Sequence, residues 1–400
     1  ISDILNVYDY IYERSNMSKQ IKHKLHGISN ITEISAKDRH TISKKAVDLI
    51  YPVVSEFKIS KEMLFNSLGK SNMYLADFDD LSMGKYDYTT NSIYFSNDLN
   101  ITNLDSSVIH EILHFFQAEL TEDNFLIRMG LFKPSKLFRP EKGLGLNEAS
   151  VQYIASTIVK EVPDHVKYYE LELTTPSSNY YPIETAIIRQ MCFFTGTYPL
   201  FFSTLFSTDL FEKTFKTITS EENYNYIEEK LTYIVQLQEK LSDVYSTIHT
   251  HNQAESKKIS VLNNITNLKN KLRETVLDVQ KIIYTSAFAN ELDKIETVQD
   301  IVNMKTLISN FENYIINYEG DYSFEQFKDK INIELNNKLA LIEAYGNYSF
   351  ALKARKDILN LPKIYSQSFI KTFFSKIKLL IDLRFNFSRS NDEELYENEI

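Results

Sequence analysis

A run of apolar residues with helical spacing occupies SSVIHEILHFFQ at residues 106–117. Asp105, Ser106 and Ser107 stand directly before Val108, the first apolar residue of this pattern, and their side chains are typical of a helix N-cap. The pattern therefore predicts a helix that begins near residue 106. Upstream, YDYTTNSIYFSND (residues 86–98) alternates aromatic and small polar residues around a Thr-Thr-Asn turn, which predicts an edge strand or a hairpin.

A second helix is predicted within GLGLNEASVQYIAS at residues 143–156, where two glycines mark a loop and Asn147 offers a cap. We expect the chain to enter this helix at Glu148. Its apolar face is formed by Ala149, Val151, Ile154, Ala155 and Ile158. The apolar spacing in residues 1–68 predicts two or three amphipathic helices. One of them has an apolar side formed by Ala46, Leu49, Ile50, Val53 and Val54.

Beyond residue 220 the chain has almost no breakers, which favours helices throughout. Two heptad-like patterns predict an antiparallel helical hairpin over residues 221–285, with the polar turn HTHNQ between its arms. The first pattern, broken by Gln238, comprises Ile227, Leu231, Ile234, Leu241, Tyr245 and Ile248. The second, broken by Lys269, comprises Leu262, Ile265, Leu272, Val276, Val279 and Ile283. Further helices are expected at 296–318, 323–345 and 349–385.

These patterns predict an α+β, predominantly helical fold in three parts. Residues 1–68 form an N-terminal helical segment, residues 69–220 form a domain with a small sheet, and residues 221–400 form an all-helical region. The 400 residues, 43% of them hydrophobic, suffice for a large globular core. The stretch MCFFTGTYPLFFSTLF (191–206) is interrupted by Gly196 and Pro199, so we expect core there and no transmembrane segment.

Charge and cysteine content narrow the function classes. The net charge of −10 argues against a nucleic-acid binder and against a basic membrane-surface patch. The single cysteine, Cys192, excludes an intramolecular disulfide and has the apolar neighbours of a buried thiol. Because the chain begins at Ile1, we expect either a removed leader or a fragment of a longer protein, and both cytoplasmic and secreted locations stay open.

The first helix carries candidate metal chemistry. His110 and His114 are one helical turn apart and can present two ring nitrogens to one ion, while Glu111 lies one position around and can take a proton from a metal-bound water. The alternative is a packed helix face. A catalytic zinc takes three protein ligands and keeps one position open, so a third ligand is needed. Glu148 at the start of the second helix is the main candidate, and His165 is its competitor.

Other chemistry-bearing residues are less specific. An oxyanion formed at such a site needs a hydrogen-bond donor, and the candidates are Tyr180, Tyr181, Tyr153 and His165. The pairs His23 with His26 and His249 with His251 lack further ligand-type spacing, so we expect them to be surface histidines.

These residues resemble the zincin metallopeptidases, and among them the gluzincins, whose signature is His-Glu-x-x-His followed by a glutamate ligand on a second helix. The matching segments are His110-Glu111-Ile112-Leu113-His114 and Asn147-Glu148-Ala149, within roughly residues 70–160. The resemblance implies Zn²⁺ held by His110, His114 and Glu148, with Glu111 as catalytic base and residues 69–220 as the catalytic domain. Gln152 stands where the thermolysin-like group has an aspartate that orients a ligand histidine, so this chain supports that histidine without a charge.

The expected function is therefore that of a zinc metalloendopeptidase acting on a protein or peptide. Zinc lowers the pKa of its bound water toward about 7 and polarises the scissile carbonyl, and Glu111 moves the proton to the leaving amine. The helical C-terminal region is available to bind a partner. The alternative is a helical interaction, regulatory or toxin-associated protein with a structural or inactive zincin core, and the presence of Glu111 speaks against it.

Overall fold

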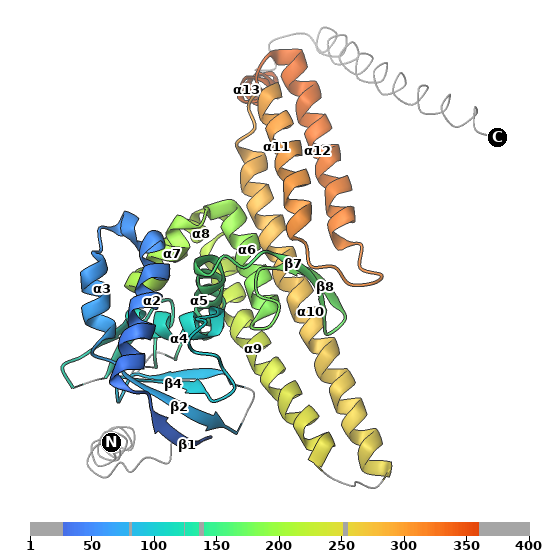
Figure 1. Ribbon diagram of the computed structural model, residues 1–400. Coiled ribbons are helices and arrows are strands. Elements are labelled where there is room, and N and C mark those ends of the chain that lie inside the picture. Colours follow the sequence, from blue (N-terminus) through green and yellow to red (C-terminus); the bar gives the residue numbers. More distant parts are fainter. Residues whose placement is uncertain (1–26, 80–81, 124, 136–139, 251–254, 360–400) are drawn as a thin grey trace, which may run out of the picture. The chain divides into compact units, whose positions relative to one another are not determined.

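The computed structural model describes residues 27–79, 82–123, 125–135, 140–250 and 255–359 (Figure 1). The expectations for His23, His26 and His251, for the helix beyond residue 359 and for residues 1–26 lie outside the described residues. The described chain is predominantly helical with small sheets, so the expected α+β class is confirmed. No helix in these ranges is both long enough and apolar enough to cross a membrane.

A four-stranded sheet forms one layer near the N-terminal end of the described chain. Its strand order is β1 (Ile28–Glu33), β2 (Asn72–Phe78), β4 (Ser92–Ser96) and β3 (Gly84–Asp87). Strand β4 is buried along its whole length and pairs parallel with β2 and antiparallel with β3. The expected hairpin at residues 86–98 is confirmed as β3–β4, and β3 is an edge strand of the sheet. Helices α2 (Ala36–Val54) and α3 (Lys61–Leu68) precede β2.

Two central helices follow the sheet. Helix α4 (Ser106–Gln117) packs on β3 and β4, while helix α5 (Leu144–Ile158) packs on α4. Helix α4 begins as predicted, because the Asp105 side chain accepts hydrogen bonds from the backbone N–H groups of Ser107 and Val108. Helix α5 begins four residues earlier than expected. The residue before it is Gly143 with a φ of 79°, whereas Asn147, the expected cap, accepts instead from the N–H of Leu131. The cap assignment to Asn147 was therefore wrong.

Short hairpins and helices complete this layer. The hairpins are β5 (Ala118–Leu120) with β6 (Leu126–Met129) and β7 (Asp164–Tyr168) with β8 (Leu171–Thr175). The helices are α6 (Pro182–Thr195), α7 (Tyr198–Phe206) and α8 (Leu210–Ile218). Cys192 on α6 is buried, and burial raises the pKa of its thiol, as expected for an unreactive cysteine.

The predicted helical hairpin is present as α9 (Glu221–Thr250) and α10 (Glu255–Asp293), which lie side by side in Figure 1. Its expected seam is buried at Ile227, Leu231, Ile234, Leu241, Ile265, Leu272, Val276, Val279 and Ile283. Leu262 was wrongly placed in the seam and is 58% exposed. It lies near the start of α10, where two helices alone bury only a narrow stripe of each other.

The remaining described helices are α11 (Val298–Phe311), α12 (Ser323–Tyr345) and α13 (Tyr348–Leu359), with the short 3₁₀ turns Ser55–Phe57 and Glu312–Tyr314. The described chain divides into two compact units. The first runs to Lys294 and also includes Asn303–Asn332, and the second comprises Ile295–Val302 with the described residues from Ile333 onward.

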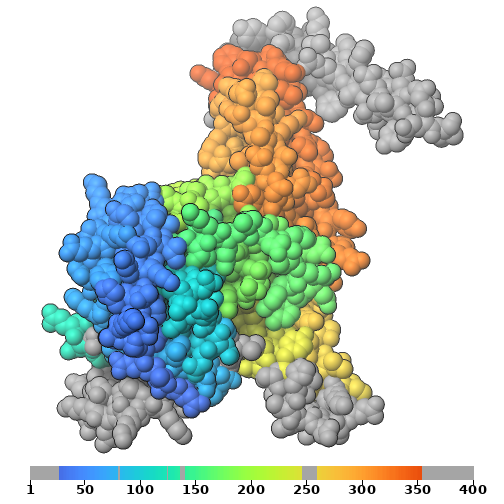
Figure 2. All heavy atoms as spheres, in the orientation of Figure 1, coloured from blue at the N-terminus to red at the C-terminus, as the bar shows by residue number. Residues whose placement is uncertain are grey.

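This division differs from the boundary expected at residue 220, because the hairpin is part of the first unit. Helix α9 packs so closely on α5 that a Cβ atom on Gly145 would lie 2.4 Å from backbone atoms of Leu231. One continuous apolar core includes residues of the sheet, of α4 to α8 and of the hairpin. Within this unit the blue, cyan and green elements form one packed body (Figure 2). The site described next lies wholly inside it.

Candidate metal centre

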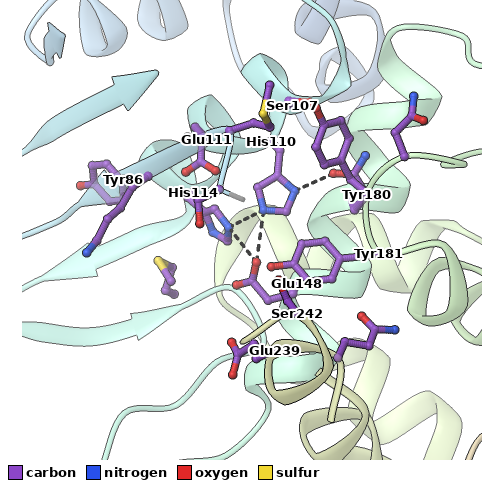
Figure 3. Close-up of a pocket in the computed structure, with 18 of the residues that line it drawn as sticks. Tyr86, Ser107, His110, Glu111, His114, Glu148, Tyr180, Tyr181, Glu239 and Ser242 are labelled. Atoms are coloured by element: carbon purple, nitrogen blue, oxygen red, sulfur yellow. Dashed lines mark hydrogen bonds and ion pairs between the residues drawn. The ribbon is translucent and has the colours of Figure 1, made fainter. Parts of the chain in front are cut away.

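His110, His114 and Glu148 converge on one point between α4 and α5 (Figure 3). The Nε2 atoms of the two histidines are 2.9 Å apart, and Glu148 Oε2 lies 3.2 Å from the first and 3.5 Å from the second. A tetrahedral ion with bonds of about 2.05 Å places its ligand atoms roughly 3.3 Å apart. The three expected ligands are therefore within metal-binding distance of one another.

Two glutamine amides hold the buried imidazole rings from behind. His110 Nδ1 lies 2.9 Å from Gln152 Oε1, and His114 Nδ1 lies 2.9 Å from Gln117 Nε2. Gln152 also donates to Ser177 Oγ at 2.9 Å, and Ser177 Oγ donates to the carbonyl of Tyr180 at 2.5 Å. Gln152 was expected to support a ligand histidine, and its side chain does contact the His110 ring. Gln117 was missed, although it follows His114 by three residues and so lies on the same helix face.

The carboxylate of Glu148 is ionised in this environment. Its burial disfavours the charged form, but the charges and hydrogen bonds of His114 and His110 outweigh that effect and hold the pKa well below the usual range. An ionised carboxylate beside two imidazole nitrogens is a donor set that suits a divalent cation.

Glu111 lies against the edge strand rather than among the three converging side chains. Burial raises its pKa to about 7, Glu148 adds to the rise, and His110, the backbone N–H of Tyr86 and Lys85 oppose it. Gly84 on β3 makes room for this side chain, because a Cβ atom there would stand 2.5 Å from Glu111 Cγ. The carboxyl group is thus placed by a hydrogen bond from β3 and by the missing side chain of Gly84.

The two tyrosines expected near the site line the same cleft as the histidines. The ring of Tyr181 stacks on that of His110, with centroids 5.9 Å apart and planes 16° from parallel. Tyr181 begins α6 with a φ of 47°, a left-handed backbone that is uncommon for tyrosine. Burial, reinforced by Glu148 and Glu184, raises its pKa far above the usual range, so the phenol keeps its proton and can donate it in a hydrogen bond.

The other two donor candidates lie elsewhere. Tyr153 is on α5 but packs edge-on against Phe201, with ring centroids 6.1 Å apart. His165 lies in strand β7, and it lines a separate pocket with Arg189. Neither residue lines the cleft around His110.

The cleft has a volume of about 630 Å³ and is bounded by two elements far apart in sequence. Strand β3 contributes Gly84, Lys85 and Tyr86. Helix α9 contributes four polar residues that were not predicted as part of the site: Gln238, Glu239, Ser242 and Asp243. The sequence does contain an indication of this polar face, because Gln238 is the residue that interrupts the first heptad pattern. A polar residue on an otherwise buried stripe marks the place where α9 faces the cleft instead of the core.

No family model, curated protein or solved structure matches this chain. The geometry of the cleft and of its side chains therefore carries the functional argument alone.

Proposed function

We propose that this protein is a zinc-dependent metalloendopeptidase that hydrolyses peptide bonds of a protein or peptide substrate. The observation that carries the proposal is the convergence of His110, His114 and Glu148 in a cleft that also holds the Glu111 carboxyl group. Metal ligands alone are compatible with a purely structural ion. A carboxyl group that is not a ligand but shares the cleft supports hydrolytic chemistry instead.

Zinc is the ion that best suits these donors. Two imidazole nitrogens and one carboxylate oxygen make a set of three protein ligands, and catalytic zinc keeps the fourth position open. When bound, the ion supplies Lewis acidity toward water and toward the carbonyl of the scissile bond. His110, His114 and Glu148 are the residues that would hold it.

Glu111 acts as the general base and then as the general acid. Its carboxylate accepts a proton from the attacking water, and the resulting carboxylic acid donates that proton to the departing amine. Burial raises the pKa of this carboxyl group, which favours its holding the proton between the two halves of this task. The backbone N–H of Tyr86 and the space left by Gly84 keep the carboxyl group in one place during the transfer.

Tyr181 is the donor best placed to stabilise the developing oxyanion. Its phenol is protonated, and its ring is held by stacking on His110 and by the start of α6. A fixed donor aimed at developing charge lowers the barrier without reorganisation cost. Tyr180 precedes it in the same cleft wall, where its carbonyl is held by Ser177.

Elemental analysis and cleavage of an unbiased peptide library test the proposal together. We expect about one zinc per wild-type chain, with cleavage that a chelator abolishes and zinc restores. Glu111→Gln should keep the zinc and lose cleavage, because it removes the base and spares the ligands. Glu148→Ala should lose zinc, since a third ligand is gone.

Two results would contradict the assignment. Full cleavage by Glu111→Gln would remove Glu111 from the mechanism. A wild-type chain without zinc and without cleavage would return α4 to ordinary helix packing and leave the function with the helical region, whose role in partner binding stays a prediction.

A further inference from the structure

A second pocket, with a volume of about 610 Å³, is lined by residues of β7, β8, α6 and the turn that follows α11. We propose that this pocket, the Arg189 pocket, binds a carboxylate group of a ligand through the guanidinium of Arg189. None of its lining residues lines the cleft around His110, so the inference is independent of the proposed function.

Arg189 on α6 is a half-buried charge without an acidic partner in the described part of the chain. The other arginine side chains that the structure describes each pair with a carboxylate: Arg39 with Glu33, Arg128 with Asp209 and Arg273 with Glu170. Acidic groups are not scarce, because the chain has 54 of them against 44 lysines and arginines. Arg189 therefore bears a desolvation cost that no opposite charge in these surroundings offsets.

Two uncharged contacts hold the guanidinium in one orientation. Its Nη1 donates to the carbonyl of Thr174 at 2.5 Å, and its Cζ lies 4.9 Å from the centroid of the Tyr314 ring. Among the described residues, Nε and Nη2 have no acceptor, and neither atom is sealed from solvent. A guanidinium that is fixed in plane and open along one edge matches the two oxygens of a carboxylate.

The wall of the pocket that follows α11 is fixed before any ligand binds. The carbonyl of Tyr314 accepts a hydrogen bond of 2.9 Å from the buried amide of Gln190. Asn317 exchanges two backbone hydrogen bonds of 2.8 Å with Glu172 on β8. Because this wall is already ordered, binding a ligand against it costs little conformational entropy of the chain.

The other polar groups of the pocket favour an anion over a cation. His165, Asn310 and Asn317 line it and supply hydrogen-bond donors. Glu312 also lines it, but its carboxylate pairs with Lys328 at 2.6 Å, so the described lining offers a cation no unpaired carboxylate. One guanidinium supplies one positive charge, which matches a singly charged carboxylate better than a phosphate group with up to two negative charges.

The test is an NMR titration of the full chain labelled with ¹⁵N-arginine, which observes the arginine Nε–H groups directly. Three probes are compared: N-acetylglutamate α-amide carries a side-chain carboxylate, N-acetylalanine carries a terminal one, and N-acetylglutamine α-amide carries none. We expect the Arg189 signal to shift and saturate with at least one of the two carboxylates and not with the glutamine derivative. The carboxylate that binds more tightly identifies the source of the group, an acidic side chain or a chain terminus.

Variants then measure the contribution of the guanidinium, with affinity determined by ligand-observed saturation transfer. Arg189→Gln should lower the affinity for the preferred carboxylate about tenfold or more, because a charge-assisted hydrogen bond is lost. Arg189→Lys should lower it less, since it keeps the charge and loses the fork. Arg39→Gln makes the same chemical change at an arginine that does not line the pocket, and it should leave the affinity unchanged.

Four results would overturn the inference. They are an Arg189 signal that moves with neither carboxylate, an equal response to the glutamine derivative, tighter binding of inorganic phosphate than of both carboxylates, and unchanged affinity in a folded Arg189→Gln variant. A wild-type titration in which no arginine signal moves is already decisive, so the inference stays testable even where a substitution prevents folding. Zinc content and cleavage play no part in these measurements, so failure here leaves the proposed function standing.

Discussion

Replacing Gly84 with alanine tests whether strand β3 sets the position of the proposed base. The new Cβ atom would stand 2.5 Å from Glu111 Cγ, whereas carbon atoms in contact keep about 3.5–4.0 Å. Glu111 must therefore move away from the strand by about 1 Å, and its bond to the N–H of Tyr86 lengthens or breaks. A displacement of about 1 Å in a reacting group costs on the order of 100-fold in rate, or roughly 2.7 kcal/mol of barrier.

The assay is steady-state cleavage of a peptide identified from the library. We expect kcat of Gly84→Ala to fall about 100-fold while KM and zinc content stay at wild-type values, because ligands and substrate contacts are spared. Gly69→Ala is the matched control, since a Cβ atom there meets chiefly the carbonyl of Phe65, at 3.2 Å, and Gly69 does not line the cleft. A folded, zinc-loaded Gly84→Ala variant with wild-type kcat would refute the placement of Glu111 by β3.

Two further changes test the tyrosine and a buried acid. Tyr181→Phe should lower kcat about 100-fold to 1,000-fold with little change in KM, and a fall confined to KM would assign Tyr181 to ground-state binding instead. Glu184 on α6 is fully buried, and burial raises its pKa from 4.5 to about 7, with Glu148 adding to the rise. The folded state therefore holds this proton more tightly than the unfolded state, so the stability contributed at low pH is lost as pH rises from about 4.5 to about 7. In chelator-treated protein, Glu184→Gln should remove this loss and unfold with roughly 3 kcal/mol more free energy than wild type at pH 8, but not at pH 4.5; parallel denaturation curves at the two pH values would contradict the assignment.

The parts of the site that sequence spacing predicted are those set by a single helix. His110 and His114 face one way because they are one turn apart on α4, and the same local rule placed the N-cap at Asp105. The convergence of these histidines with Glu148 depends on how α4 packs against α5. Sequence spacing could therefore identify Glu148 only as a candidate ligand. The start of α5 was misjudged because Asn147 has a side chain suited to capping, yet tertiary packing uses that side chain to hold the N–H of Leu131.

The parts that sequence spacing missed depend on contacts between distant elements. The polar residue Gln238 indicates a break in the buried stripe of α9, but spacing alone does not indicate what the break faces, since the two walls of the cleft come from segments about 150 residues apart. Gln238 was recognised as an interruption, but its reason is visible only once α9 lies on α5. Gln117 follows His114 by three residues on the same helix and was overlooked, because the contact of its amide with the His114 ring is visible only in the structure.

The close approach of α5 and α9 at Gly145 and Leu231 limits how this protein can be modified. The helix that carries Glu148 and the helix that carries the polar wall of the cleft meet backbone to backbone, so neither tolerates independent redesign. In a protein built from separate domains, the recognition domain can be replaced while the other domain is left unchanged. Here a new α9 would have to be accommodated by α5 in the same step, so new specificity is expected to arise through point changes on the exposed turns of α9 rather than by recombination.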